Sequence, residues 1–216
     1  MAYRHTENVA RRLAARYAAI IAAAREAASE GGMGAVQIAP VARRAGIAAG
    51  TVYRYFPGKT DLVAALLAEI TDREIGALRL AGDVAPGPLS ALACAIVTFV
   101  ARVLRIRRLA FAVIAEPVDA VLDPVRLRLR KALLTEFATR IAAAVTGGHL
   151  PEQDPSLAAA ALVGLLTEAS IGPLAPDAAG RERERVQSLA LIALRALGLA
   201  DARARGLVVQ TVIGDR

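Results

Sequence analysis

The chain has 216 residues, which is enough for one large domain or two small ones, and 56% of them are hydrophobic. That fraction exceeds what one ordinary core needs, so it favours an apolar ligand cavity, a subunit interface, or both. Tryptophan is absent and aromatic residues make up only 4%, so helices are favoured over a sheet. A single cysteine, Cys94, excludes an intrachain disulfide and a cysteine-based zinc site.

The net charge of +7 is unevenly distributed. The first 61 residues contain 9 basic and 4 acidic side chains, whereas the remaining 155 contain 18 and 16. An excess of positive charge in one segment is typical of binding to a polyanion such as nucleic acid. The alternative is a general preference for arginine, because 25 of the 27 basic residues are Arg.

The N-terminal segment is expected to begin with a loose arm over residues 1–8. Helical spacing then predicts a helix from about Val9 to Glu30, with Arg12 and Arg16 outside, which ends in a glycine-rich turn. Its inner side is expected to consist of Leu13, Tyr17, Ile20, Ile21, Ala24 and Ala28.

Two short helices with the spacing of a helix-turn-helix follow. The first is predicted over Pro40–Ala45 and the second over Ala49–Phe56, and Gly46 allows a left-handed turn between them. Pro57 ends the second helix, and a new helix starts at Lys59.

The second short helix has two different faces. Ala49, Val52 and Phe56 fall on the face expected to anchor it. The opposite face combines a glycine, which permits close approach, with a guanidinium that can bind the O6 and N7 atoms of guanine. The outward residues are Gly50, Thr51 and Arg54, with the hydroxyls of Tyr53 and Tyr55 on the flanks, where they could reach phosphates.

A long helix from Lys59 to about Leu80, with Leu62, Leu66 and Ile70 inward, should join this unit to a second all-helical region that begins after Gly82–Pro88. The period-2 run Arg126–Lys131 is a strand signal, but the segment continues through Phe137 and Ile141 with helical spacing, which favours a helix. No assignment is made for Leu207–Arg216. The helices expected in the second region span Leu89–Leu104, Arg108–Ala115, Asp123–Gly147, Asp154–Ile171 and Arg181–Leu197.

Neither a signal peptide nor a membrane span is expected. The uncharged run Val84–Ala101 is interrupted by Pro86, Gly87 and Pro88, which leaves too short a stretch to cross a bilayer. The sequence therefore predicts a cytoplasmic soluble protein.

Motifs for catalysis are absent from the sequence: it contains no GxSxG, HExxH, P-loop or Rossmann glycine pattern. The two histidines, His5 and His149, are expected on an arm and in a loop. We therefore expect no catalytic residue, no metal site and no cofactor.

An apolar pocket in the second region would be lined by Phe99, Phe111, Ile114 and Phe137, although core packing explains these residues equally well. Two isolated acids, Glu116 and Glu168, would either pair with an arginine or contact a ligand.

The helix Leu157–Ile171 is apolar nearly all round and rich in small residues, which favours close packing against another helix. It could be a central core helix or half of an intersubunit four-helix packing. The interface candidates are Leu162, Leu165, Leu166, Leu189 and Ala193.

The N-terminal part resembles the TetR family of bacterial transcriptional repressors over roughly Arg16–Leu66. The residues that carry the resemblance are Ile20-Ile21, Ala23-Ala24, Gly31, Val41-Ala42, Ala45-Gly46-Ile47, Gly50–Phe56, Lys59 and Leu62.

This resemblance implies an all-helical homodimer whose last two long helices pair, with an effector pocket in the larger domain. It also implies phosphate contacts from Thr51, Tyr53, Tyr55 and Lys59, and it places Gly50 and Arg54 toward the bases. The sequence departs from the family at Gln37 and Ala48, where a hydroxyl residue often caps the helix, and at Pro40, where an acid is common. Each lost cap costs on the order of 1 kcal/mol, so packing must hold the unit.

The sequence therefore predicts an all-α protein with a DNA-binding domain over residues 1–58 and an effector-binding and dimerisation domain over residues 59–216. Its function would be that of a ligand-responsive repressor that binds a palindromic DNA operator as a homodimer and is released by a small hydrophobic or amphipathic effector. The alternative is a helical small-molecule carrier or enzyme that retains a non-functional helix-turn-helix.

Overall fold

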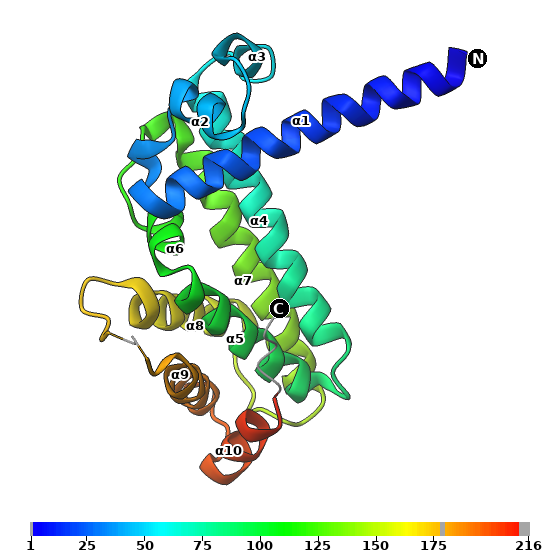
Figure 1. The fold of residues 1–216 in the computed structure, drawn as a ribbon. Helices are drawn as coiled ribbons and strands as arrows, with labels where there is room; N and C mark the ends of the chain where they lie inside the picture. The colour runs from blue at the N-terminus through cyan, green and yellow to red at the C-terminus, as the bar shows by residue number, and fades with distance from the viewer. Residues whose placement is uncertain (1, 178–179, 212–216) are drawn as a thin grey trace. The chain divides into compact units, whose positions relative to one another are not determined.

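The computed structural model describes residues 2–177 and 180–211. These residues form helices and no strand, which confirms the predicted all-α class, and the Arg126–Lys131 run is helical. The elements are α1 (Ala2–Gly31), η1 (Met33–Ala35), α2 (Ile38–Arg44), α3 (Ala49–Tyr53), α4 (Lys59–Asp83), α5 (Pro88–Arg105), α6 (Arg107–Ile114), η2 (Ala120–Leu122), α7 (Asp123–Thr146), α8 (Pro155–Ile171), α9 (Glu182–Ala196) and α10 (Asp201–Gln210), where η marks a short 3₁₀ helix (Figure 1).

The chain folds as two compact units, and the boundary between them cuts α4 after Ile70. The first unit contains Met1–Ile70 and Arg108–Arg126, and the second contains Thr71–Arg107 and Leu127–Arg216. The first unit thus extends beyond residue 58. The predicted functional division between residues 58 and 59 stays a prediction.

The core of the first unit forms where α1, α2, α3 and the start of α4 meet. Ile20 on α1, Val41 on α2, Val52 on α3 and Leu62 on α4 are all fully buried. Because each is the inward position of its helix, the apolar spacing in the sequence is enough to place them.

Two predictions for α1 are wrong. The helix begins at Ala2, so the residues expected to form a loose arm are helical. Leu13 and Tyr17, which were expected to face inward, are 49% and 42% exposed, because α1 continues past the elements that cover its second half (Figure 1).

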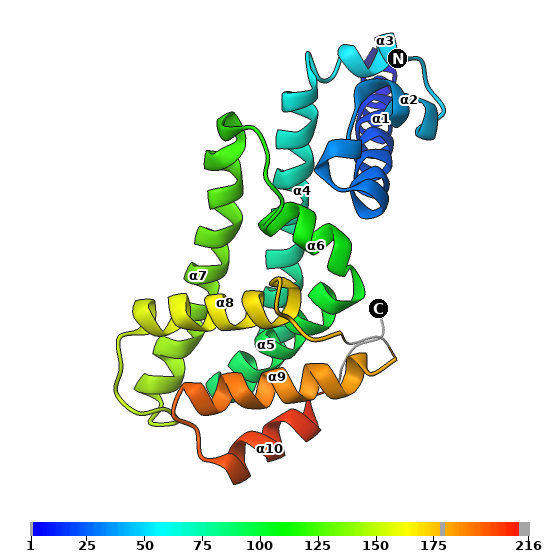
Figure 2. The same ribbon diagram turned by 90° about the vertical axis from the view of Figure 1, so that its left-hand side faces the viewer.

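Helix α5 is at the centre of the second unit, where it contacts α8, α9 and α10 (Figure 2). By length and apolar composition it is the one helix of the described residues that could cross a membrane, although the sequence predicted too short a stretch. In the structure 56% of this helix is buried against the protein itself. This burial accounts for its apolar composition as that of a core helix.

The C-terminal segment contains a helix that the sequence did not predict. Helix α10 follows α9 closely and contacts both α9 and α5, with Ala204 and Val208 buried (Figure 2). The remainder of the segment left unassigned, Val212–Arg216, lies outside the described residues.

Candidate nucleic-acid interface

The turn between α2 and α3 has the geometry that the sequence predicted. Gly46 adopts a left-handed backbone conformation with φ 68°, which is strained for any residue with a side chain. The Ile47 amide donates to the Ala42 carbonyl oxygen at 3.0 Å, so the turn folds back onto the end of α2. This arrangement fixes the direction in which α3 leaves the turn.

Helix α3 is shorter than predicted, because it ends at Tyr53 rather than at Phe56. Pro57 disfavours a helical backbone at Phe56, so the helix does not extend through that residue. The Phe56 amide still donates to the Val52 carbonyl oxygen at 2.9 Å, so Arg54 remains on the same side as Gly50.

The two faces of α3 are divided as expected. Val52 and Phe56 are buried and anchor the helix, whereas Gly50, Tyr53 and Arg54 are exposed. A Cβ atom added at Gly50 would meet no atom within 4 Å, so the glycine is not required for packing inside the chain. An outward surface with this open position is suited to close approach by another molecule.

The missing helix caps are confirmed. Gln37 and Ala48 are the N-cap residues of α2 and α3, and neither side chain makes a capping hydrogen bond. The Gln37 side-chain amide instead donates to the Gly34 carbonyl oxygen at 3.0 Å. Packing by Val41 and Val52 therefore has to hold these short helices in place.

Tyr55 belongs to an aromatic cluster that the sequence did not reveal. The ring centroids of Tyr17 and Phe56 are 5.3 Å apart, and those of Tyr17 and Tyr55 are 6.5 Å apart. The Tyr55 hydroxyl donates to the Leu13 carbonyl oxygen at 3.5 Å. Tyr55 is thus partly engaged with α1, and its phosphate contact stays a prediction.

An ion-pair cluster that joins α2 to α1 was also missed. Arg44 on α2 contacts both carboxylate oxygens of Glu30, with 2.7 Å for one pair, and it reaches Glu26 at 3.4 Å. The hydrogen bond from Arg44 lowers the pKa of the Glu30 carboxyl. Because the folded pKa is lowered, this interaction stabilises the fold at neutral pH and is lost as the pH falls through that value.

Several exposed cations in the first unit have no acidic partner among the described residues. They lie on α1, on α2, and on both sides of the turn after α3. An unpaired, solvent-facing cation keeps its full charge for an external anion. These cations are Arg12, Arg16, Arg43, Arg54 and Lys59.

The predicted pocket residues are divided between the two units. Phe99 and Phe137 are buried in the second unit, with their rings edge to face and their centroids 6.1 Å apart. Glu168 is exposed. Phe111, which is 41% exposed, and the buried Ile114 belong to the first unit.

Neither of the two cavities described for this structure is lined by any of the predicted pocket residues. One, of about 780 Å³, lies along the end of α1 and along α2, and the other, of about 350 Å³, lies beside α10. The predicted effector pocket therefore stays a prediction.

Glu116 has a structural partner, which is a backbone amide rather than an arginine. Its carboxylate accepts a hydrogen bond from the Met33 N–H at 3.0 Å, in the turn between α1 and α2. The preceding residue, Gly32, has φ 73°, and a Cβ atom there would lie 2.4 Å from the Glu116 carboxylate. The segment after α6 thus holds the backbone just before the helix-turn-helix.

Replacing Glu116 with alanine should free the Met33 amide. A hydrogen bond to a charged group contributes about 1.5–3 kcal/mol, so amide hydrogen exchange at Met33 should accelerate by about tenfold or more. The Ile47 amide, bonded within the helix-turn-helix, is the internal control and should not change. Unchanged exchange at Met33 would contradict this role for Glu116.

Four of the five predicted interface residues are buried within the protomer: Leu162, Leu166, Leu189 and Ala193. Only Leu165 is partly exposed. Since α8 is apolar nearly all round, its spacing could not indicate which side faces the core. A second copy would have to use the other side of these helices.

Among the described residues, no group of three or more His, Cys, Asp or Glu side chains is arranged to hold a metal ion.

Comparisons with known proteins match the same segment. Residues 20–66 match the model of the bacterial regulatory proteins of the tetR family. The HTH-type transcriptional repressor KstR of Rhodococcus jostii is 52% identical over 46 residues, which is 21% of this chain and 22% of that repressor. The match therefore spans about a fifth of the length of that relative.

Among the solved structures that resemble this chain, two match most of its length. The fatty acid degradation regulator FadR of Bacillus halodurans has a TM-score of 0.72 and 23% identity, and the match covers 82% of this chain and 97% of that one. The regulator FadR of Bacillus subtilis, in complex with stearoyl-CoA, has a TM-score of 0.66 and 22% identity, with coverages of 91% and 99%. At these identities the likeness shows a shared fold.

Proposed function

We infer that this protein is a ligand-responsive transcriptional repressor that binds a palindromic DNA operator as a homodimer. Its residues 20–66 match the model of the tetR family of bacterial regulatory proteins. The observation that carries this proposal is the outward face of α3, where Gly50, Tyr53 and Arg54 are exposed above a buried anchor. Such a face has no role inside the chain, and its size and charge suit the major groove of DNA.

Each exposed group has a distinct proposed role. Arg54 would read a guanine, and Gly50 would let the backbone approach the base edges. Thr51, Tyr53, Tyr55 and Lys59 would contact phosphates, which position the protein without reading sequence. Because the hydroxyl caps are missing, affinity would depend strongly on Lys59 and on the cations of α1, Arg12 and Arg16.

Lys59 offers a direct test of a phosphate contact. The only other lysine in the chain, Lys131, serves as the matched control. Each neutralised phosphate contributes about 0.9 to the slope of log K against log salt. Lys59→Ala should therefore flatten that slope by about 1 per subunit, as measured by fluorescence anisotropy over a salt series. Lys131→Ala, at an exposed position on α7, should leave the slope unchanged. If both variants changed the salt slope equally, Lys59 would not be a specific phosphate contact.

The dimer would form through the sides of α8 and α9 that the protomer leaves open. Leu157 on α8 is 70% exposed and Ile192 on α9 is 48% exposed, and the two helices contact each other. The exposed Ala161 and Gly164 permit close helix approach. A two-fold pairing would place the recognition helices about 34–36 Å apart, so that they meet two half-sites of a palindrome.

The effector would be a small hydrophobic or amphipathic molecule bound near Phe99 and Phe137. The stearoyl-CoA complex of the Bacillus subtilis regulator supports this class of ligand, since that protein shares the fold. By binding more tightly to a conformation with a different spacing of the recognition helices, the effector would release the DNA.

The alternative, a helical carrier or enzyme with a non-functional helix-turn-helix, is less well supported. It gives no reason for unpaired cations to gather beside α3. The relatives of residues 20–66 are transcriptional regulators, which supports a non-catalytic function. As a regulator of DNA, the protein would act in the cytoplasm.

A further inference from the structure

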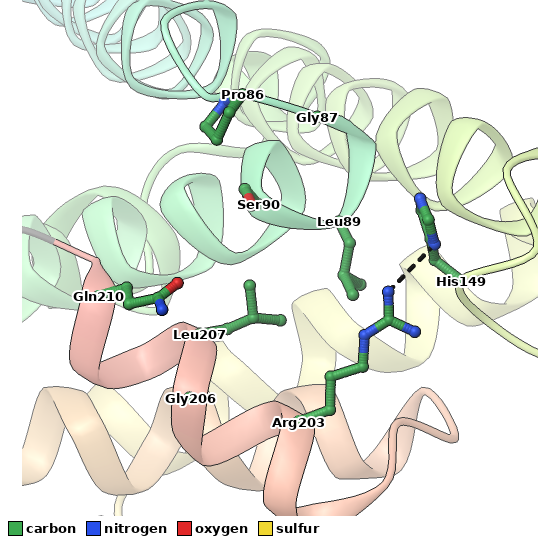
Figure 3. Close-up of a pocket in the computed structure, with 9 residues that line it drawn as sticks. All are labelled: Pro86, Gly87, Leu89, Ser90, His149, Arg203, Gly206, Leu207 and Gln210. Carbon is green, nitrogen blue, oxygen red and sulfur yellow. Dashed lines mark hydrogen bonds between the residues drawn. The ribbon is translucent and has the colours of Figure 1, made fainter.

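A second ligand site, separate from the proposed effector pocket, is indicated at one end of the second unit. A cavity of about 350 Å³ lies between the first turn of α5, His149 in the turn after α7, and one side of α10 (Figure 3). This volume is at the lower end of the range for small-molecule sites. The residues of α10 that line it, Arg203, Gly206, Leu207 and Gln210, follow helical spacing and share one side.

Two glycines keep this cavity open although the fold does not require them. Gly206 is in the interior of α10, where glycine costs about 1 kcal/mol relative to alanine. A Cβ atom added at Gly206 or at Gly87 would meet no atom within 4 Å. Gly87 has an extended backbone with φ −179°, which any residue adopts. Neither close packing nor backbone conformation therefore accounts for the missing side chains.

Among the described residues, the cavity is lined by a cation and by no carboxylate. Arg203 lies beside His149, with its Nη2 atom 3.2 Å from the His149 Nδ1 atom (Figure 3). A guanidinium can only donate, so Nδ1 is the acceptor and the imidazole leaves the positive charge uncompensated. The nearby acid Asp201 accepts hydrogen bonds from Arg205 and Arg195, which lower its pKa. Among the described residues Arg203 has no acidic partner.

The opposite wall supplies both positive potential and apolar surface. Helix α5 has no side-chain cap at Gly87, so the amides of its first turn retain capacity to donate, and the helix dipole adds positive potential there. Leu89 and Leu207 provide apolar surface (Figure 3). One cation beside apolar walls matches a ligand with one anionic group on a short hydrocarbon chain.

We propose that this cavity binds a small organic acid, with its carboxylate at Arg203 and its hydrocarbon chain between Leu89 and Leu207. The site uses no residue of the helix-turn-helix, so ligand binding can be measured without DNA.

Isothermal titration calorimetry of the full chain without DNA tests this site, with hexanoate as the probe. Hexanoate should bind saturably, and its neutral analogue hexanamide should bind at least tenfold more weakly. Arg203→Met should weaken hexanoate binding at least tenfold by removing the charge, and Gly206→Leu should do so by filling the cavity. Gly206→Leu should not lower the melting temperature, because it removes a glycine from a helix.

Two matched variants on α4, at exposed positions of the same unit, serve as controls. Arg73→Met and Gly76→Leu should change hexanoate affinity by less than twofold. Hexanoate affinity that is unchanged in both cavity variants would overturn the site and place any binding elsewhere. Equal binding of hexanamide would overturn the role of Arg203. Inorganic phosphate that binds as tightly as hexanoate would overturn the organic-acid class.

Discussion

Replacing Arg54 with alanine should abolish discrimination at one base pair in each half of the operator. A bidentate contact to guanine contributes about 1–3 kcal/mol of discrimination, and a symmetric dimer would lose two such contacts. Preference for the intact palindrome over one changed at that base pair in both halves should therefore fall by about 2–6 kcal/mol. Titrations against a set of operators, each changed at one base-pair position in both halves, would measure this loss.

The pattern across variants separates base reading from phosphate binding. Arg43→Ala is the matched control, because Arg43 is an exposed, unpaired cation on α2 among the described residues. It should weaken binding uniformly, if it has any effect. If Arg54→Ala also weakened binding equally for every operator variant, Arg54 would contact the backbone rather than a base.

The second large effect is expected from Glu136, a buried acid that joins α4 to α7 in the second unit. It accepts hydrogen bonds from Arg79 at 3.0 Å and from Arg140 at 2.9 Å. Arg140 is 90% buried and also reaches the exposed Asp83 at 3.4 Å. Glu136 is thus the main acid opposite a guanidinium that water scarcely reaches.

Glu136→Ala should lower the free energy of unfolding by about 3 kcal/mol, because it leaves the buried Arg140 without its principal partner. The value is at the low end for buried pairs, since Arg79 is largely exposed and can be hydrated. Asp83→Ala removes the other acid near Arg140 and should cost no more than about 1 kcal/mol. Urea unfolding followed by circular dichroism would compare them. Equal losses of unfolding free energy in the two variants would show that the buried Glu136 stabilises the fold no more than the exposed Asp83 does.

Local signals in the sequence were sufficient where the determinants lie within a few residues. Asp154 before Pro155 predicts the start of α8, and its carboxylate accepts from the Ser156 and Leu157 amides. Gly46 predicts the left-handed turn, and the helical spacing of Val52 and Phe56 predicts the anchor of α3. These features depend on backbone conformation and on helical period alone.

Features that depend on distant segments could not be predicted in the same way. The stripe containing Leu13 and Tyr17 has helical spacing, but nothing in the sequence says whether another element covers it. Glu116 is 83 residues from its partner Met33, so no spacing rule links them. The first half of helix α10 is charged, so its sequence shows no clear helical spacing of the few apolar residues that pack against α5 and α9.

The central claim is that this chain binds a specific operator and releases it in response to a ligand. A gel-shift titration with DNA from upstream of the chain's own gene, over a range of salt concentrations and with hydrophobic or amphipathic ligands added, tests it most directly. We predict dimeric, sequence-selective binding whose affinity falls steeply with salt and falls further with an effector. The absence of salt-sensitive, sequence-selective binding in every ligand state would contradict the account.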